Sequence, residues 1–341
     1  MKKYLLNTVK FFAFLSVGIL LLWLAFRGVK MDSFLNSFHH IKIGWIILPF
    51  LFSFSAFWIR AFRWQLLIEP LGYSTSLLNA YHAVSMGYFA NFAFPRIGEI
   101  TRCGVLNRTD KVPFDALIGT VITERIFDLL MLLLSVVIVF VIKINFFGSF
   151  LTQNIFQPMW AKMHAMFSSL WIPALILVAL FVAMIAVVIM FKHRIKKITM
   201  VQKMHALVKG ILQGLLSFRH MQKKGLFLLH TFLLWFCYFV MSWLPFYSME
   251  ATSHLTAIDG LFMLVLSGLA ITAPVQGGIG VFHALISFAL VSLYGLTKEE
   301  ALAFSIILHE SQSIFYILLG IISFAFLTLK KNNQQTILSK K

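Results

Sequence analysis

The chain has 341 residues, of which 60% are hydrophobic and 12% are charged, about half the ~25% charged share of a soluble domain. Several apolar runs reach the ~20 residues that a helix needs to cross a bilayer. No segment is long and polar enough to form a separate soluble catalytic domain. These features exclude a soluble enzyme. They predict an all-α, polytopic membrane helix bundle that forms a single integral membrane domain over residues 1–341.

The formal net charge is +17, from 29 Lys and Arg against 12 Asp and Glu. Basic residues beside spans mostly mark cytoplasmic loops, and attraction to anionic lipid headgroups is the second interpretation. The two cysteines, Cys103 and Cys237, have no disulfide-framework or metal-ligand spacing. The chain has no nucleotide-binding motif either. We therefore expect no cofactor, no metal and no nucleic-acid partner.

Nine apolar segments follow one another along the chain, at residues 9–26, 43–68, 77–95, 112–142, 170–191, 225–247, 257–275, 281–295 and 300–328. No small-residue cleavage site follows the first segment, so we expect it to be a retained span. The N-terminus carries three lysines and the loop 192–224 carries nine Lys and Arg, which places both in the cytoplasm. An even number of crossings must separate them. One of the five segments between them therefore does not cross fully.

Segment 77–95 is the best candidate for the incomplete crossing, because it contains polar residues and runs directly into a charged stretch. A re-entrant backbone is tolerated only where it is buried in protein or lines a polar cavity. In the second half, segments 257–275 and 281–295 are short and are joined by a Pro-Gly run at 274–280. A 15-residue helix rises about 22 Å against a core of ~30 Å. We therefore predict six full spans and two opposed re-entrant hairpins.

This arrangement divides the chain into two halves, 1–191 and 225–328, joined by the basic cytoplasmic loop 192–224. Paired interrupted segments in two halves indicate a substrate site at the middle of the membrane, and an inverted repeat is a hypothesis here. Lysines also follow the last span, so both termini are expected in the cytoplasm of a multi-pass protein of the cell (inner) membrane.

The first polar stretch runs from Asn91 to Arg102 and contains the helix breaker Pro95. Arg96 and Arg102 carry permanent positive charge, and Glu99 lies three residues from each. In one interpretation the two cations hold an anionic headgroup. In the other, the three charges neutralise one another at the end of a hairpin.

Two further charged motifs lie on predicted spans. Arg60 and Arg63 share one helix face, either as cations that end a span or as one wall of a phosphate site. Glu124 and Asp128 also share a face, and Arg125 is three residues from Asp128. These charges either lock the arginines in place or serve a proton relay.

The glycine run contains Gly277, Gly278 and Gly280, which allow the backbone to approach closely. The helix that begins at residue 281 would point its amide hydrogens at an anion, with His283 in its first turn. We include these four residues in the candidate binding site.

His309 and Glu310 lie inside the last apolar segment. They do not form a zinc-protease motif, because that motif needs a second histidine where this chain has Ser313. We expect them to join the central polar network as titrating groups.

The arginine pair with Trp64, the stretches 95–102 and 124–128, and the run 274–280 together resemble the membrane region of the lysylphosphatidylglycerol synthase family. The resemblance covers essentially the whole chain. It implies flipping or export of a lipid with a charged or phosphorylated headgroup. In two-domain members a soluble aminoacyltransferase domain follows the membrane region, whereas this chain stops after its last span, so lipid aminoacylation is not expected. Members often carry a glutamate after the glycine run, where this chain has His283, which suggests a different lipid.

The leading expectation is an integral membrane lipid transporter or flippase rather than an enzyme, with Arg96, Arg102 and Arg60 or Arg63 holding the lipid phosphate. Its partners are membrane lipids that are anionic or bear a phosphate. The alternatives are a membrane-embedded transferase acting on a lipid-linked substrate and a non-catalytic lipid-binding scaffold. The candidate protein partners are further copies of this chain in a homo-oligomer, or a lipid-modifying enzyme.

Overall fold

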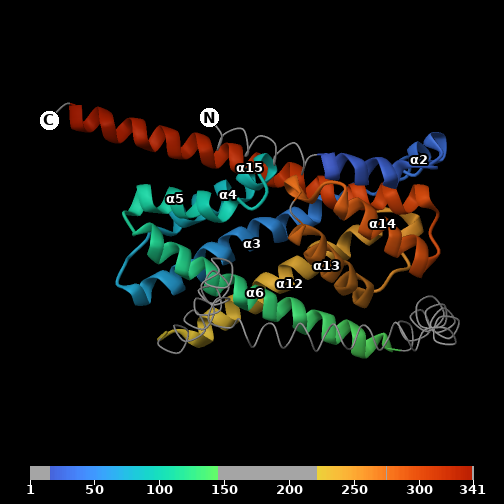
Figure 1. Ribbon diagram of the computed structural model, residues 1–341, viewed down its shortest axis with the longest axis horizontal. Helices are drawn as coiled ribbons and strands as arrows, with labels where there is room; N and C mark the ends of the chain where they lie inside the picture. The colour runs from blue at the N-terminus through green and yellow to red at the C-terminus, as the bar shows by residue number, and fades with distance from the viewer. Residues whose placement is uncertain (1–15, 145–220, 274, 340–341) are drawn as a thin grey trace, which may run out of the picture.

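The computed structural model describes residues 16–144, 221–273 and 275–339, with side chains up to residue 330. These residues form helices and short 3₁₀ turns, with no strand among them (Figure 1). After an apolar helix at Ser16–Phe26, the α-helices are α2 (Met31–Asn36), α3 (Gly44–Ile68), α4 (Leu77–Ala93), α5 (Gly98–Asp110), α6 (Phe114–Ile142), α12 (Lys224–Trp243), α13 (Ala257–Thr272), α14 (Val281–Tyr294) and α15 (Lys298–Ser339). The 3₁₀ turns are η1 (Glu69–Leu71), η3 (Leu244–Ser248), η4 (Glu250–Thr252) and η5 (Gln276–Gly278).

Among the described residues, five helical stretches are long and apolar enough to cross a membrane: Gly44–Leu71, Phe114–Ile142, Lys224–Ser248, Gln276–Tyr294 and Lys298–Lys330. This confirms the predicted all-α polytopic membrane bundle. Four of the stretches coincide with predicted full spans. The first predicted span is described only from Ser16 onward, and segment 170–191 with most of the basic loop lies outside the described residues. The total of six full spans therefore stays a prediction.

The first hairpin is formed by α4 and α5, which lie side by side. The chain reverses at Arg96, whose φ of 61° lies in the left-handed region. The helices cross where two glycines meet, because a Cβ atom on Gly98 would lie 2.3 Å from the carbonyl oxygen of Gly87. Helix α4 has 17 residues and is about 26 Å long. The helix–turn–helix is thus present, and its re-entry from one side of the membrane stays a prediction.

The second hairpin is formed by α13 and α14 around η5. These helices have 16 and 14 residues, or about 24 and 21 Å, which is less than the ~30 Å core. Gly277, Gly278 and Gly280 have positive φ angles of 58°, 80° and 84°, and glycine adopts these angles without strain. Because Gln276–Tyr294 is also long enough to cross as one stretch, re-entry at this hairpin stays a prediction as well.

The tips of the two hairpins touch. The Phe92 ring packs on Gly277, where a Cβ atom would lie 2.9 Å from the ring. The Arg96 guanidinium donates a hydrogen bond to the carbonyl oxygen of Thr272 at the end of α13, a position where backbone carbonyls lack partners and favour a cation. In Figure 1 α4 and α5 lie on one side of the molecule and α13 and α14 on the other. The two hairpins therefore meet at their tips, and their entry from opposite sides of the membrane stays a prediction.

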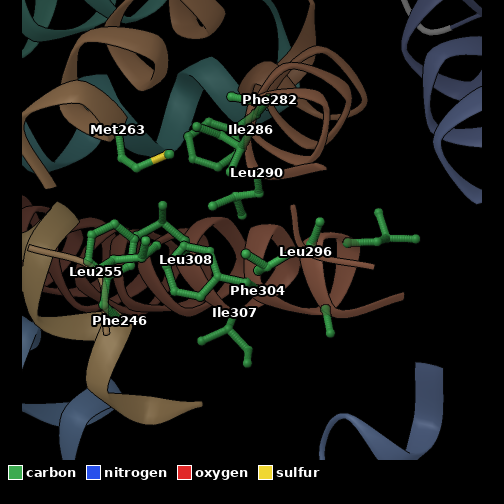
Figure 2. Close-up of a cluster of buried hydrophobic side chains, with 14 of the residues drawn as sticks. Phe246, Leu255, Met263, Phe282, Ile286, Leu290, Leu296, Phe304, Ile307 and Leu308 are labelled. Carbon is green, nitrogen blue, oxygen red and sulfur yellow. The ribbon is translucent and has the colours of Figure 1, made fainter. Parts of the chain in front are cut away.

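The largest apolar core packs α13 and α14 against the first half of α15. Figure 2 shows its central side chains, which come from η3, the loop after η4, these three helices and the loop between α14 and α15: Phe246, Leu255, Met263, Phe282, Ile286, Leu290, Leu296, Phe304, Ile307 and Leu308. A second core surrounds Trp64 and joins α3, α4, α5 and α6. Most of α6, by contrast, exposes leucine, isoleucine and valine, which suits a helix that faces lipid.

The contact between α4 and α5 leads to a first prediction. Replacing Gly98 by Ala places a methyl group against the Gly87 carbonyl and should destabilise the detergent-solubilised protein by about 1–3 kcal/mol. The matched control is Gly104→Ala in the same helix, because a Cβ atom there meets no described residue within 4 Å. Thermal unfolding followed by tryptophan fluorescence compares the two variants. Equal Tm values would contradict the close contact.

Candidate functional site

A buried network of five charged side chains joins three helices, and we call it the arginine–carboxylate network. Arg60 and Arg63 of α3 each contact both carboxylates of α6, at 2.7 and 3.0 Å and at 2.9 and 2.7 Å. Arg102 of α5 donates to Oε2 of Glu124 at 2.8 Å. Glu124 therefore accepts from three arginines, while Asp128 accepts from Arg60 and Arg63. Such charges are tolerated in a low-dielectric interior only when they are paired and hydrogen-bonded.

Aromatic side chains complete the surroundings of the network. The Tyr238 hydroxyl of α12 accepts hydrogen bonds from Arg60 at 3.1 and 3.3 Å and lies 3.2 Å from the Tyr88 hydroxyl of α4. The Arg102 guanidinium lies 4.8 Å from the centre of the Trp64 ring, within the range of a cation–π contact. Five helices thus meet at one polar centre. Tyr88 and Tyr238 are not among the site residues predicted from the sequence; their hydroxyl groups in apolar helices are the signal that could have found them.

The network carries more positive than negative charge, because three arginines and two carboxylates leave a formal charge of +1. None of the five side chains is more than 12% exposed, so solvent screens this excess poorly. Among the described residues, Arg102 has the fewest partners of the three arginines, because it contacts one carboxylate whereas Arg60 and Arg63 each contact two. Its Nε atom, like that of Arg63, has no hydrogen-bond partner there. The excess charge is therefore least compensated at Arg102.

A small cavity lies beside Arg102 at the crossing of α4 and α5. Its volume is about 20 Å³, which is room for about one water molecule. Tyr88, Asn91, Glu99, Arg102 and Arg125 supply its polar lining. Asn91 accepts the Gly98 N–H at 2.8 Å and so holds the turn of the hairpin. Arg125 and Glu99 form an ion pair at 2.9 Å, with side chains 47% and 29% exposed, and thus form the outer wall of the cavity.

The structure corrects several expectations about this region. Arg60 and Arg63 do not extend to a membrane surface, because both are buried and paired with carboxylates, which leaves little of either guanidinium for a phosphate wall. Glu99 pairs with Arg125, so the expected charge pairing of Glu99 with Arg96 and Arg102 does not form.

The structure also shows which arginines the two α6 carboxylates hold and how Arg125 lies relative to Asp128. Glu124 and Asp128 do lock arginines, but they hold Arg60, Arg63 and Arg102. Arg96 is exposed and lies at the hairpin contact. The expected contact of Arg125 with Asp128 is present but long, at 3.8 Å.

His283, His309 and Glu310 form a second polar centre, which we call the histidine–glutamate cluster. His309 Nε2 lies 2.8 Å from the Gly277 carbonyl oxygen, and its Nδ1 lies 2.9 Å from Glu310 Oε1. His283 Nε2 lies 3.5 Å from the same carboxylate oxygen. The ion pairs of these side chains stay within the cluster. His309 and Glu310 therefore do not join the arginine–carboxylate network as expected.

The donor atoms of this cluster lie within 4.8 Å of one another, which is close enough for a shared metal ion. Their hydrogen bonds argue against one. The Gly280 N–H points at Nδ1 of His283 at 3.4 Å, so a neutral His283 carries its hydrogen on Nε2, the nitrogen that faces Glu310. A metal-bound histidine instead donates its other ring nitrogen to an acceptor. The geometry thus favours hydrogen bonding over metal ligation.

The N-terminus of α14 differs from the expected anion contact. A Cβ atom on Gly280 would lie 2.1 Å from the carbonyl oxygen of Gly18, so the first apolar helix covers this end of α14. The His283 ring occupies the capping position beside it. Close helix packing, rather than an open anion site, explains the glycine at position 280.

Fold and site together define a polytopic, all-α membrane protein that buries an arginine–carboxylate network beside two helical hairpins whose tips touch. The chain belongs to the family described as the lysylphosphatidylglycerol synthase TM region, whose family model matches residues 11–320. This confirms the family resemblance found in the sequence motifs.

The chain is also similar to the UPF0104 membrane protein MJ1595 of Methanocaldococcus jannaschii, with 28% identity over 103 residues. The match spans 29% of this chain and 31% of that curated relative, less than a third of either. No solved structure matches the chain significantly.

The central role of Glu124 can be tested by replacing it with glutamine, which has nearly the same shape but no charge. Glu124→Gln leaves three buried arginines with one carboxylate, and breaking such an interaction costs about 3–5 kcal/mol. We expect a large loss of monodisperse protein and of Tm in detergent. Glu99→Gln is the matched control, because it removes a single, partly exposed ion pair worth about 0–1 kcal/mol. If both variants were equally stable, Glu124 would not hold the bundle together.

Proposed function

We propose that this protein is a flippase-like lipid transporter that binds a phosphate-bearing lipid headgroup at Arg102. The observation that carries the proposal is the buried excess of one positive charge, which is least compensated at this arginine. A lipid phosphodiester carries one negative charge and would balance the network. A guanidinium is suited to this ligand, because its planar fork can donate to two phosphate oxygens.

Arg125 supports the proposal as a second cation on the same cavity. Its nearest carboxylate is Glu99, with Asp128 farther away at 3.8 Å. The Arg125 and Glu99 side chains are both partly exposed, so a phosphate can exchange with Glu99 at a small cost. A headgroup would then lie between Arg102 and Arg125. The cavity holds about one water molecule, so we interpret this conformation as closed. Entry of a headgroup requires α4 and α5 to move away from α6.

The contact between the hairpin tips supports a barrier across the transport path. Arg96 binds the end of α13, and Phe92 packs on Gly277. In our proposal α4–α5 enters from the cytoplasm, where both termini lie, and α13–α14 enters from the opposite side. The acyl chains stay in the bilayer along the exposed apolar helices. The family's description refers to a phosphate-bearing lipid, which also favours this ligand class.

The proposal is tested in liposomes that contain a trace of fluorescent phosphatidylglycerol, with dithionite added outside. The wild type should expose inner-leaflet probe to the quencher. Arg102→Gln should lose this activity, because it removes the cation that lines the cavity, whereas Arg108→Gln should keep it. Arg108 is the matched control, since it lies on the same helix and is exposed.

Each outcome of this assay has a defined meaning. Quenching that is the same with and without wild-type protein, for several lipid classes, would overturn transport. Wild-type activity in folded Arg102→Gln protein would overturn the assigned site. Mass spectrometry of the recovered lipid separates the alternatives, because a covalently altered lipid favours the transferase and a bound, unmoved lipid favours the scaffold.

A further inference from the structure

The hydrogen bonds of His309 determine how many protons His309 and Glu310 must hold between them. A backbone carbonyl can only accept, so the 2.8 Å contact with Gly277 places a hydrogen on Nε2 of His309. The other ring nitrogen, Nδ1, lies 2.9 Å from Glu310 Oε1. A neutral ring would present a lone pair to an ionised carboxylate at that distance. One additional proton must therefore lie between the two groups, on His309 or on Glu310.

The second histidine is oriented by the same reasoning. The Gly280 N–H faces Nδ1 of His283 at 3.4 Å, so a neutral His283 directs its Nε2 hydrogen toward Glu310 at 3.5 Å. With one additional proton the cluster has no net charge. Without that proton it has a charge of −1 inside a membrane-crossing helix, where an uncompensated charge is costly.

The neighbours of the cluster offer no other charge in the part of the chain that the structure describes. Helix α14 contributes His283, η5 contributes the Gly277 carbonyl, and α15 adds Ser313 at 3.5 Å from His309 Nδ1. Phe92 of α4 packs on η5, and α3 faces α15 through the uncharged pair of Ser53 and Gln312. The charge of the cluster is thus set by its own three members.

We propose that His283, His309 and Glu310 form a proton-binding site that couples proton movement to the position of the α13–α14 hairpin. Loss of the proton makes His309 Nδ1 and Glu310 repel each other. Glu310 is 39% exposed whereas both histidines are buried, so Glu310 is the group that moves away. His309 holds Gly277, the residue on which Phe92 of the opposite hairpin packs. Coupling of this proton to lipid movement rests on the proposed transport function.

The proton site itself is tested without any transport measurement. Nitrogen NMR of the full chain in lipid bilayers, labelled at histidine, reports which ring nitrogens carry hydrogen. We expect either a doubly protonated His309 or a singly protonated His309 with an infrared band from a Glu310 carboxylic acid. His309→Gln and Glu310→Gln should each remove this signature. His230→Gln should retain it, because His230 is a half-buried histidine of α12 whose ring contacts a backbone carbonyl of its own helix.

Two results would overturn the proton site. One is a neutral His309 beside an ionised Glu310 at neutral pH. The other is a stoichiometric metal ion in the purified protein that is lost in His283→Gln, because a metal would then replace the proton.

The coupling is tested in liposomes that contain fluorescent phosphatidylglycerol and an interior pH dye. In the wild type, an imposed pH difference should change the rate of lipid movement and produce a proton flux. In Glu310→Gln both responses should be lost. Wild-type lipid movement that ignores the pH difference would overturn the coupling and leave the proposed transport intact. Absence of any lipid movement would overturn the proposed transport, while NMR still decides the proton site.

Discussion

The fold depends on Glu124 and the three arginines that share its carboxylate. Water is scarce at this depth, so each guanidinium must find its acceptors among the helices. Arg60, Arg63 and Arg102 converge on one side chain of α6, and this convergence fixes how α3, α5 and α6 are rotated about their axes. Membrane helices gain little from apolar burial against one another. A shared buried acceptor is therefore a strong constraint on their register.

The arginine–carboxylate network also has a charge imbalance that bears on function. Two carboxylates cannot neutralise three arginines, and the uncompensated charge lies beside the cavity at Arg102. The histidine–glutamate cluster has the complementary need, because it is neutral only when it holds an additional proton. The arginine–carboxylate network thus favours binding of an anion, and the histidine–glutamate cluster favours binding of a proton. In the proposed mechanism the two centres influence each other through the hairpin tips, where Arg96 contacts Thr272 and Phe92 packs on Gly277.

Glycine makes this arrangement sterically possible. Gly98 meets the backbone of Gly87, Gly280 meets that of Gly18, and Gly320 of α15 meets the Phe89 side chain of α4. At each point a Cβ atom would lie within 2.5 Å of its neighbour. Such contacts are typical of membrane helices, which associate through close van der Waals packing. They bring the polar side chains of neighbouring helices within hydrogen-bonding distance.

The amino-acid sequence alone determined the class of protein, the family, the long apolar helices α3, α6, α12 and α15, and the helix breaks near Pro95 and at the glycine run 277–280. These features are local, because they follow from hydropathy, from helix rise and from the backbone freedom of glycine. Only the tertiary structure decided which charged side chains pair with one another. Glu99 pairs with Arg125 rather than with Arg96 or Arg102, and Glu310 lies apart from the arginines. Spacing along one helix shows which residues share a face, but the rotation and packing of a second helix decide what that face meets.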